Sequence, residues 1–273
     1  MYAAFHSVLL HNDPILVALE KVAKAGYDGL ELNAETLPWA TPHVGPDTSG
    51  EERRKLVAAA REANLRLPAI GAHIDMLGGG DQARAGAADF VKGCVDLAVD
   101  VQCPVVHILS GKQPDDMSRA TAMGRFADAV EAVTDYAVSR GVALGIEAIA
   151  GMLFHSIDDY AELGSMLPGT DFRINFDPSH LFVQGEDPLE LVKNHGDRIC
   201  HMHIKDGAGR YPEFSFPPLG QGGIEFAPLI SALQEIGYAG ALSIEYEAQV
   251  FGYQEAEPDI LRRSREFLHQ FGI

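Results

Sequence analysis

Hydrophobic residues along the chain follow two alternating patterns, short β-rich runs and longer amphipathic segments in which apolar residues return every three or four positions. The short runs predict eight strands, at residues 2–7, 28–33, 66–73, 104–110, 142–148, 171–177, 198–205 and 240–247. The longer segments predict eight helices, at residues 14–25, 51–63, 83–99, 118–139, 156–167, 187–195, 225–236 and 254–271. Eight strands that are each followed by a helix predict an α/β fold closed into a (β/α)8 TIM barrel, rather than an open sheet.

The segments that connect these elements are short, and no long linker or low-complexity tract divides the chain. We therefore predict a single domain that spans residues 1–273. Gly26, Gly141 and Gly237 close three predicted helices, where a left-handed C-cap is typical. The longest stretch without a periodic pattern, residues 206–223, follows the seventh strand. Long loops inside compact domains are often functional, so we expect this one to cover a substrate.

Alternation within the last four predicted strands places polar residues on the inner face of the barrel, since strand residues point in turn to the helices and to the interior. An apolar outer row is predicted from Val142, Leu144, Ile146, Phe172, Ile174, Phe176, Cys200, Met202, Ile204, Leu242, Ile244 and Tyr246. The inner row is then Ala143, Gly145, Glu147, Arg173, Asn175, Asp177, His201, His203, Lys205, Ser243, Glu245 and Glu247. Barrel enzymes build their active sites at the carboxyl ends of the strands, so we expect the last of these residues to share one site.

Earlier strands add polar residues to the same interior by the same alternation. Glu31 opposes Leu30 and Leu32, His73 is in phase with Gly71, and His107 is in phase with Val105; His6 joins this set if the short first strand keeps the phase. We expect Glu31, His73 and His107 to contact a substrate, together with Lys205 and with Arg210 from the loop that follows.

Three inward carboxylates in one barrel mouth would repel one another and would be costly to bury without a cation. A divalent metal ion bound by Glu147, Asp177, His203 and Glu245 removes that cost. Three oxygen donors and one nitrogen donor suit Mn²⁺ or Mg²⁺, with Co²⁺ or Zn²⁺ as alternatives. The sequence therefore predicts one divalent metal site, with Mn²⁺ as the first choice.

Composition and net charge limit the classes of binding partner that the protein can have. Hydrophobic residues make up 47% and charged residues 22%, which is typical of a globular domain. The 21 basic and 39 acidic residues give a net charge of −18, which repels nucleic acids and anionic membranes. The three cysteines form no C-x-x-C pair, the N-terminal stretch lacks a basic leader, and no apolar run is long enough to cross a bilayer. We therefore predict a cytoplasmic protein with a small-molecule partner, and we leave open whether it forms a homodimer or a higher homo-oligomer.

In this order and spacing, six motifs resemble those of the xylose-isomerase-like barrels. They are Gly26-Tyr-Asp-Gly-Leu-Glu-Leu32, Gly145-Ile-Glu147, Asn175-Phe-Asp-Pro-Ser-His180, His201-Met-His-Ile-Lys-Asp206, Pro218-Leu-Gly-Gln-Gly-Gly-Ile224 and Ser243-Ile-Glu-Tyr246. The branch they resemble is the sugar phosphate isomerase/epimerase family, whose relatives include ketose 3-epimerases, inosose isomerases and endonuclease IV. The resemblance extends over essentially the whole chain.

The resemblance implies a metal held by the same Glu, Asp, His and Glu, of which Glu147 and Glu245 would also be the acid and base of an epimerase. It further implies that His180 binds a substrate hydroxyl and that Arg210 lies near an epimerase arginine. The chain departs from ketose 3-epimerases at Leu153, where those enzymes carry a further glutamate, and Arg210 lies about one position away from the expected place. Both departures argue against a free ketohexose as the substrate.

The chemistry of such a site is enediolate chemistry. A metal ion can polarise a ketone, and a carboxylate can then remove the neighbouring C–H proton. Return of the proton to the opposite face gives an epimer, and return to the adjacent carbon gives an aldose–ketose isomer. We therefore predict a metal-dependent isomerase or epimerase that acts on a keto-sugar or related polyol ketone. The closest alternative is a decarboxylase, dehydratase or deglycosidase that reaches the same intermediate from a keto-sugar or keto-acid.

Two more distant alternatives belong to other classes. A zinc-dependent AP endonuclease could use His73, His107 and His180 with the four metal ligands, but residues 207–244 contain no histidine for the remaining ligands, and the charge of −18 opposes DNA. A non-catalytic binding protein would have little use for a carboxylate-rich barrel mouth.

Overall fold

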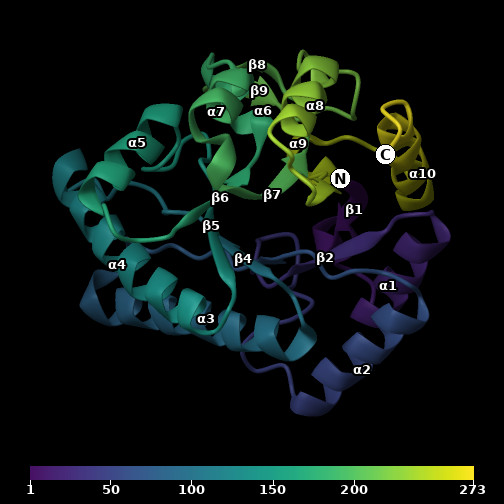
Figure 1. Ribbon diagram of the computed structural model, residues 1–273, viewed down its shortest axis with the longest axis horizontal. Coiled ribbons are helices and arrows are strands. Elements are labelled where there is room, and N and C mark those ends of the chain that lie inside the picture. Colours follow the sequence, from purple (N-terminus) through teal and green to yellow (C-terminus); the bar gives the residue numbers. More distant parts are fainter.

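The computed structural model describes the backbone of residues 1–273 and all side chains except those of residues 248 and 249. Eight parallel strands close into one barrel, in the order β1-β10-β7-β6-β5-β4-β3-β2, so the predicted TIM barrel is confirmed. Figure 1 shows these strands at the centre of a ring of helices. The barrel strands are β1 (Tyr2–His6), β2 (Gly29–Asn33), β3 (Ile70–Gly71), β4 (Val105–Ile108), β5 (Ala143–Ile146), β6 (Arg173–Phe176), β7 (Ile199–Ile204) and β10 (Ala241–Ile244).

All eight predicted helices are present, with small shifts at their ends. They are α1 (Ile15–Lys24), α2 (Gly50–Glu62), α3 (Gly80–Val101), α4 (Arg119–Ser139), α5 (Ile157–Met166), α7 (Pro188–His195), α8 (Phe226–Glu235) and α10 (Glu257–His269). Gly26, Gly141 and Gly237 have φ angles of +83°, +73° and +75°, as predicted for left-handed helix ends. In the described chain, no helix has the length and apolar character needed to cross a membrane.

Several short elements were not predicted. They are the 3₁₀ turns η1 (Ser7–Leu10) and η2 (Gly196–Arg198), the helices α6 (Pro178–Gln184) and α9 (Ala248–Phe251), and the strands β8 (Ala208–Arg210) and β9 (Glu213–Ser215). The two strands pair antiparallel, so residues 206–223, which were expected to be irregular, contain a small hairpin.

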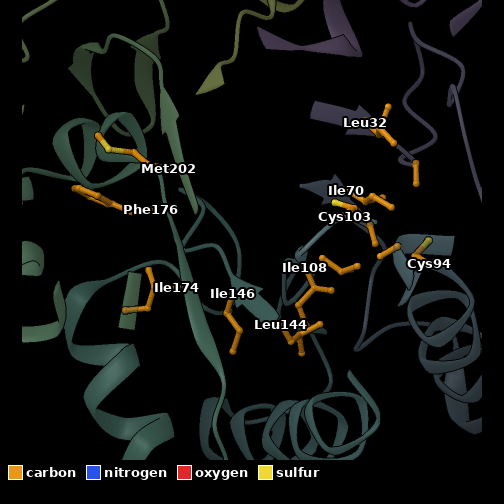
Figure 2. Packing of buried hydrophobic residues seen from close by; sticks show 14 of the residues in the cluster. Leu32, Ile70, Cys94, Cys103, Ile108, Leu144, Ile146, Ile174, Phe176 and Met202 are labelled. Atoms are coloured by element: carbon orange, nitrogen blue, oxygen red, sulfur yellow. The ribbon is translucent and has the colours of Figure 1, made fainter. Parts of the chain in front are cut away.

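The apolar outer row of the strands packs against the helices and forms the core. Figure 2 shows Leu144 and Ile146 of β5, Ile174 of β6 and Met202 of β7 in this layer, and each is buried to 0% exposure. Burial of one such side chain stabilises the fold by about 1.5–3 kcal/mol. Because this layer fixes the outer row, the alternate residues of each strand must face the barrel interior.

Cys200 is the exception to the predicted alternation. The register between β6 and β7 shifts at Ile174 and Asn175, as in a β-bulge. The Cys200 Sγ atom lies 3.2 Å from the place that a Cβ atom on Gly145 would take, and it faces the Ile174 carbonyl at 3.4 Å. Cys200 therefore lies with the inner row rather than the outer one, because a bulge inserts a residue that the two-residue period does not count.

Candidate metal centre at the carboxyl end of the barrel

Four side chains from four neighbouring strands converge at the carboxyl end of the barrel. Glu147 follows β5, Asp177 follows β6, His203 lies in β7 and Glu245 follows β10. One donor atom of each lies within 4.8 Å of the others. All four residues are at most 9% exposed. The structure thus brings together the four residues that were predicted to hold a metal ion.

Glu147 is oriented by polar neighbours inside the barrel. Asn175 Nδ2 donates to its Oε2 atom at 2.7 Å, and His73 Nε2 lies 3.3 Å from the same oxygen. Burial alone would raise the pKa of Glu147, but the nearby His203 and His73 hold it well below the usual range. Asn175 and His73 therefore hold the side chain in a fixed orientation.

Asp177 has two separate tasks. Its Oδ1 atom accepts from the backbone N–H of Ser179 at 2.8 Å and from the Ser179 hydroxyl at 2.6 Å, so it caps the N-terminus of α6. The cap fixes the carboxylate and turns Oδ2 toward the other three ligands. Asp177 followed by Pro178 is the usual start of a helix, and this signal in the sequence could have predicted α6.

His203 is held from behind by Glu31. Its Nε2 atom lies 2.9 Å from Glu31 Oε1, which leaves Nδ1 facing Glu245 Oε2 at 3.5 Å and Glu147 Oε2 at 3.6 Å. Glu31 is completely buried and also accepts from His107 Nε2 at 2.7 Å and from His201 Nε2 at 2.8 Å. Such a carboxylate behind a histidine fixes its tautomer and keeps the other ring nitrogen free for a metal.

The burial of Glu31 alone would raise its pKa, but the surrounding imidazoles, led by His203, hold it well below its usual range. His6 also lies in this group, with Nε2 3.5 Å from Glu31 Oε1, so the first strand keeps the phase that the alternation required.

Lys205 closes the other side of the centre. Its Nζ atom lies 2.5 Å from Glu245 Oε2 and 2.9 Å from Asp177 Oδ2. Burial would raise the pKa of Glu245, but Lys205 and His203 lower it to about 2. The ring of Phe216, next to β9, lies 4.6 Å from the ammonium group and edge-on to His180. The hairpin therefore brings an apolar side chain over the polar cluster, as expected for a loop that covers the site.

The residues present fit a divalent metal ion. Among the described side chains, His203 Nδ1 and Asp177 Oδ2 are buried atoms with no hydrogen-bond partner, although Lys205 Nζ is in ionic contact with the latter. Buried polar atoms are rarely left without a partner, so an unpaired nitrogen beside three carboxylates indicates a place for a cation. Donors bound to one metal ion at about 2.0–2.2 Å would lie roughly 3–4 Å apart. The distances from His203 Nδ1 to the carboxylate oxygens are 3.5, 3.6 and 4.0 Å.

Two of the predicted substrate-binding histidines lie beside this centre. His180 Nε2 is 3.8 Å from both Glu147 Oε1 and Asp177 Oδ2, and burial together with Lys205 lowers its pKa to about 4. Burial alone would lower the pKa of His73, but hydrogen bonds to Glu147 and Glu35 raise it to about 10.

Lys205 lies at the centre, as described above, but the remaining three predicted substrate contacts are placed differently. Glu31 and His107 are completely buried and bonded to each other beneath the centre, so neither lines the cavity at the mouth. Arg210 lies on the outside of the hairpin, where its guanidinium covers the Phe182 ring at 4.9 Å and donates to the Phe182 carbonyl at 2.8 Å. The structure therefore does not bring Arg210 to the metal ligands.

A cavity of about 390 Å³ opens at the barrel mouth next to His73. It is formed by the loops that follow β2, β3, β4 and β5 and by Phe90 of α3. Its lining residues are Glu35, Thr36, His73, Ile74, Asp75, Phe90, Leu109, Gly111, Lys112 and Met152. Because His73 also lies 3.3 Å from Glu147, the cavity adjoins the cluster of candidate ligands.

Asp206 was missed in the sequence, although it ends the motif that contains His203. It is 1% exposed, and its carboxylate accepts from the backbone N–H groups of Gly220 and Gly222 at 2.9 Å, and also from Gly207 and Ile224. This one side chain ties the far end of the long loop to the strand that carries His203. An acidic residue followed by a glycine-rich loop was the available signal, since backbone N–H groups of such loops bind anions.

The fold is that of a xylose isomerase-like barrel, with a cluster of Glu, Asp and His side chains at its mouth that could hold a metal ion. The sequence profile of the xylose isomerase-like TIM barrel family matches residues 19–271, and the chain belongs to this family. Among its curated relatives, the L-ribulose 3-epimerase of Methylomonas sp. (strain DH-1) is 25% identical over 238 residues, which cover 84% of this chain and 77% of the relative.

A second relative, the L-ribulose-5-phosphate 3-epimerase UlaE of Salmonella paratyphi A, is 27% identical over 229 residues, which cover 81% of this chain and 78% of the relative. The crystal structure of the IOLI protein with a bound zinc atom superimposes with a TM-score of 0.81 at 18% identity, and the match covers 97% of this chain and 96% of that one. At this identity the similarity to IOLI shows the fold. The curated relatives are sugar epimerases, which is consistent with the isomerase or epimerase predicted from the sequence.

Proposed function

We propose that this protein is a divalent-metal-dependent isomerase or epimerase that acts on a keto-sugar or related polyol ketone. The observation that carries the proposal is the convergence of Glu147, Asp177, His203 and Glu245 within 4.8 Å. The two relatives support it because one is an L-ribulose 3-epimerase and the other an L-ribulose-5-phosphate 3-epimerase.

The four ligands would hold the metal ion, with Mn²⁺ as the first choice and Mg²⁺, Co²⁺ or Zn²⁺ as alternatives. When bound, the ion supplies Lewis acidity to a ketone and its neighbouring hydroxyl. The chain contributes the orientation of the ligands, through Glu31 behind His203 and the α6 cap at Asp177.

Glu147 and Glu245 are the proposed acid and base. They follow β5 and β10, which are separated in the barrel wall by β6 and β7. One carboxylate removes the proton from the C–H next to the ketone, and the electron pair of that bond forms the enediolate. The other glutamate, which has first taken up a proton from water, returns that proton to the opposite face, which inverts the carbon. If the proton returns to the adjacent carbon instead, the product is an aldose–ketose isomer.

His180 and Lys205 complete the proposed contacts to the substrate. His180 Nε2 faces the same space as Glu147 and Asp177, so it can bond a substrate hydroxyl. The Lys205 ammonium lies between Glu245 and Asp177, where it can also bond a substrate oxygen. Phe216 covers these two side chains and limits the access of water, which protects the enediolate from side reactions.

The test is a panel of keto-sugars and keto-acids, incubated with the Mn²⁺-loaded protein in D₂O and followed by NMR. We expect deuterium at the carbon next to the ketone, together with an epimer or an aldose–ketose isomer, and we expect EDTA to stop both. Release of CO₂ or of a β-leaving group without an epimer would identify the lyase alternative. Exchange that is unaffected by EDTA would contradict the metal dependence.

A further inference from the structure

The backbone turns at the barrel mouth already hold carboxylates of the chain itself. Asp206 accepts from N–H groups of the glycine-rich loop 218–224, and Asp75 accepts from those of residues 77–78 at 2.9 and 3.0 Å. Asp177 does the same at the start of α6. Glycine-rich turns and helix starts are the usual places where proteins bind phosphate. At these three places a substrate phosphate would have to displace a carboxylate.

The cations near the mouth are also engaged. The Lys205 ammonium is in contact with Asp177 and Glu245, and Glu247 lies 3.6 Å away. Arg210 lies over Phe182, outside the cluster. Among the residues with described side chains, Lys112 and His73 are the cations that line the cavity, together with the carboxylates of Glu35 and Asp75. The ring of His73 is already paired, with Nδ1 3.4 Å from Glu35 Oε2 and Nε2 3.3 Å from Glu147 Oε2.

This charge distribution favours hydroxyl groups over phosphate. A phosphate monoester carries roughly −1.5 to −2 charges at neutral pH, and like charges placed together weaken binding strongly. A sugar hydroxyl, in contrast, is neutral and can donate to a carboxylate such as Glu35. On the basis of the proposed function, we infer that the substrate is an unphosphorylated polyol ketone whose hydroxylated tail lies in the cavity lined by Glu35, Asp75 and Lys112.

The inference separates two chemistries that both occur among the relatives, a free ketose and a ketose phosphate. The experiment compares matched pairs, L-ribulose with L-ribulose 5-phosphate and D-fructose with D-fructose 6-phosphate. The Mn²⁺-loaded protein is incubated with each in D₂O, and kcat/KM for exchange and epimerisation is measured. We expect kcat/KM for the better free ketose to exceed that for its phosphate ester on the order of 10²-fold, because the ester brings like charge next to the carboxylates of Glu35 and Asp75.

Variants test whether the cavity causes this preference. Glu35→Gln removes one negative charge at nearly constant shape and should raise the relative kcat/KM of the phosphate ester about 3- to 10-fold, the scale of one nearby charge. The matched control is Glu131→Gln on the exposed face of α4, which should leave the ratio unchanged. A phosphate ester that is the better substrate, with a preference that Lys112→Ala abolishes, would overturn the inference and leave the proposed function intact. No exchange with any member of the panel would overturn both.

Discussion

Glu31 offers a test of how the barrel interior prepares a metal ligand. Its two oxygens accept from three imidazole rings, with Oε1 2.9 Å from His203 and 2.7 Å from His107, and Oε2 2.8 Å from His201. In Glu31→Gln, the NH2 group of the amide replaces one of these oxygens. Whichever way the amide turns, at least one ring must exchange an N–H donor for an acceptor or lose its partner.

The expected loss of stability and of metal affinity follows from the hydrogen bonds that the variant loses. If the amide nitrogen takes the Oε2 place, one hydrogen bond is lost, and leaving a buried donor unsatisfied costs about 1–3 kcal/mol. If it takes the Oε1 place, His203 must shift its proton to Nδ1, the nitrogen that faces the carboxylates. Loss of such a supporting carboxylate lowers metal affinity about 10- to 100-fold. We therefore expect a lower melting temperature and weaker metal binding in the same variant.

The assay is Mn²⁺ and Zn²⁺ binding in competition with a chromophoric chelator, combined with ¹⁵N NMR of the imidazole nitrogens to assign the His203 tautomer. The matched control is Asp159→Asn, which alters another buried carboxylate. Asp159 accepts from the backbone N–H groups of residues 155 and 156 at the start of α5 and pairs with Arg119, so none of these partners is a candidate metal ligand. The control substitution should lower stability and leave metal affinity unchanged. A folded Glu31→Gln protein with native metal affinity and an unchanged tautomer would refute the positioning role.

Four further predictions concern the centre and its cover. Asp177→Asn and His203→Ala should each lose the single metal ion expected per chain in protein purified without chelator, and elemental analysis that finds native metal content in both would contradict the ligand assignment. Glu147→Gln and Glu245→Gln should each lose on the order of 10²-fold or more in turnover, with one of them still exchanging the substrate C–H for deuterium, and near-native turnover with metal bound would exclude both as the base. Asp206→Ala removes the acceptor of four backbone N–H groups and should speed limited proteolysis within residues 207–223, whereas an unchanged cleavage pattern would show that the loop is held by other contacts. An abasic-site DNA duplex should stay intact with excess Zn²⁺ at low salt, and EDTA-sensitive incision by the pure protein would restore the endonuclease alternative.

Except at Cys200, alternation predicted the side of the barrel wall correctly, but it carried no information about depth. Glu31 and Glu147 are both inward residues, yet Glu31 lies beneath the centre and Glu147 takes part in it. Depth depends on the register between strands, such as the pairing of His6 with Glu31 and of Gly71 with His107. Register is set by contacts between distant segments, so a period read along one strand cannot reveal it.

The elements that the sequence analysis missed are short or irregular. α6 has seven residues, too few for a helical period to be recognised, although its start signal at Asp177 was present. The predicted strand 66–73 shrinks to the two residues of β3, since Pro68 has no backbone N–H to donate. The bulge at Cys200 reflects the fit between β6 and β7, which again depends on tertiary contacts.

The loop of residues 206–223 is anchored at both ends, and this affects which parts of the barrel can change in sequence without moving the candidate metal ligands. The loop leaves β7 at Asp206 and returns to the same carboxylate at Gly220 and Gly222. The hairpin between these points can therefore change in length or sequence while the strand that carries His203 stays in place. Exchanging residues 208–217 among relatives would alter what lies above the centre, as Phe216 does here, without disturbing the ligands. For protein engineering, the hairpin could therefore be exchanged to change the range of substrates, while the side chains at the barrel mouth stay in place.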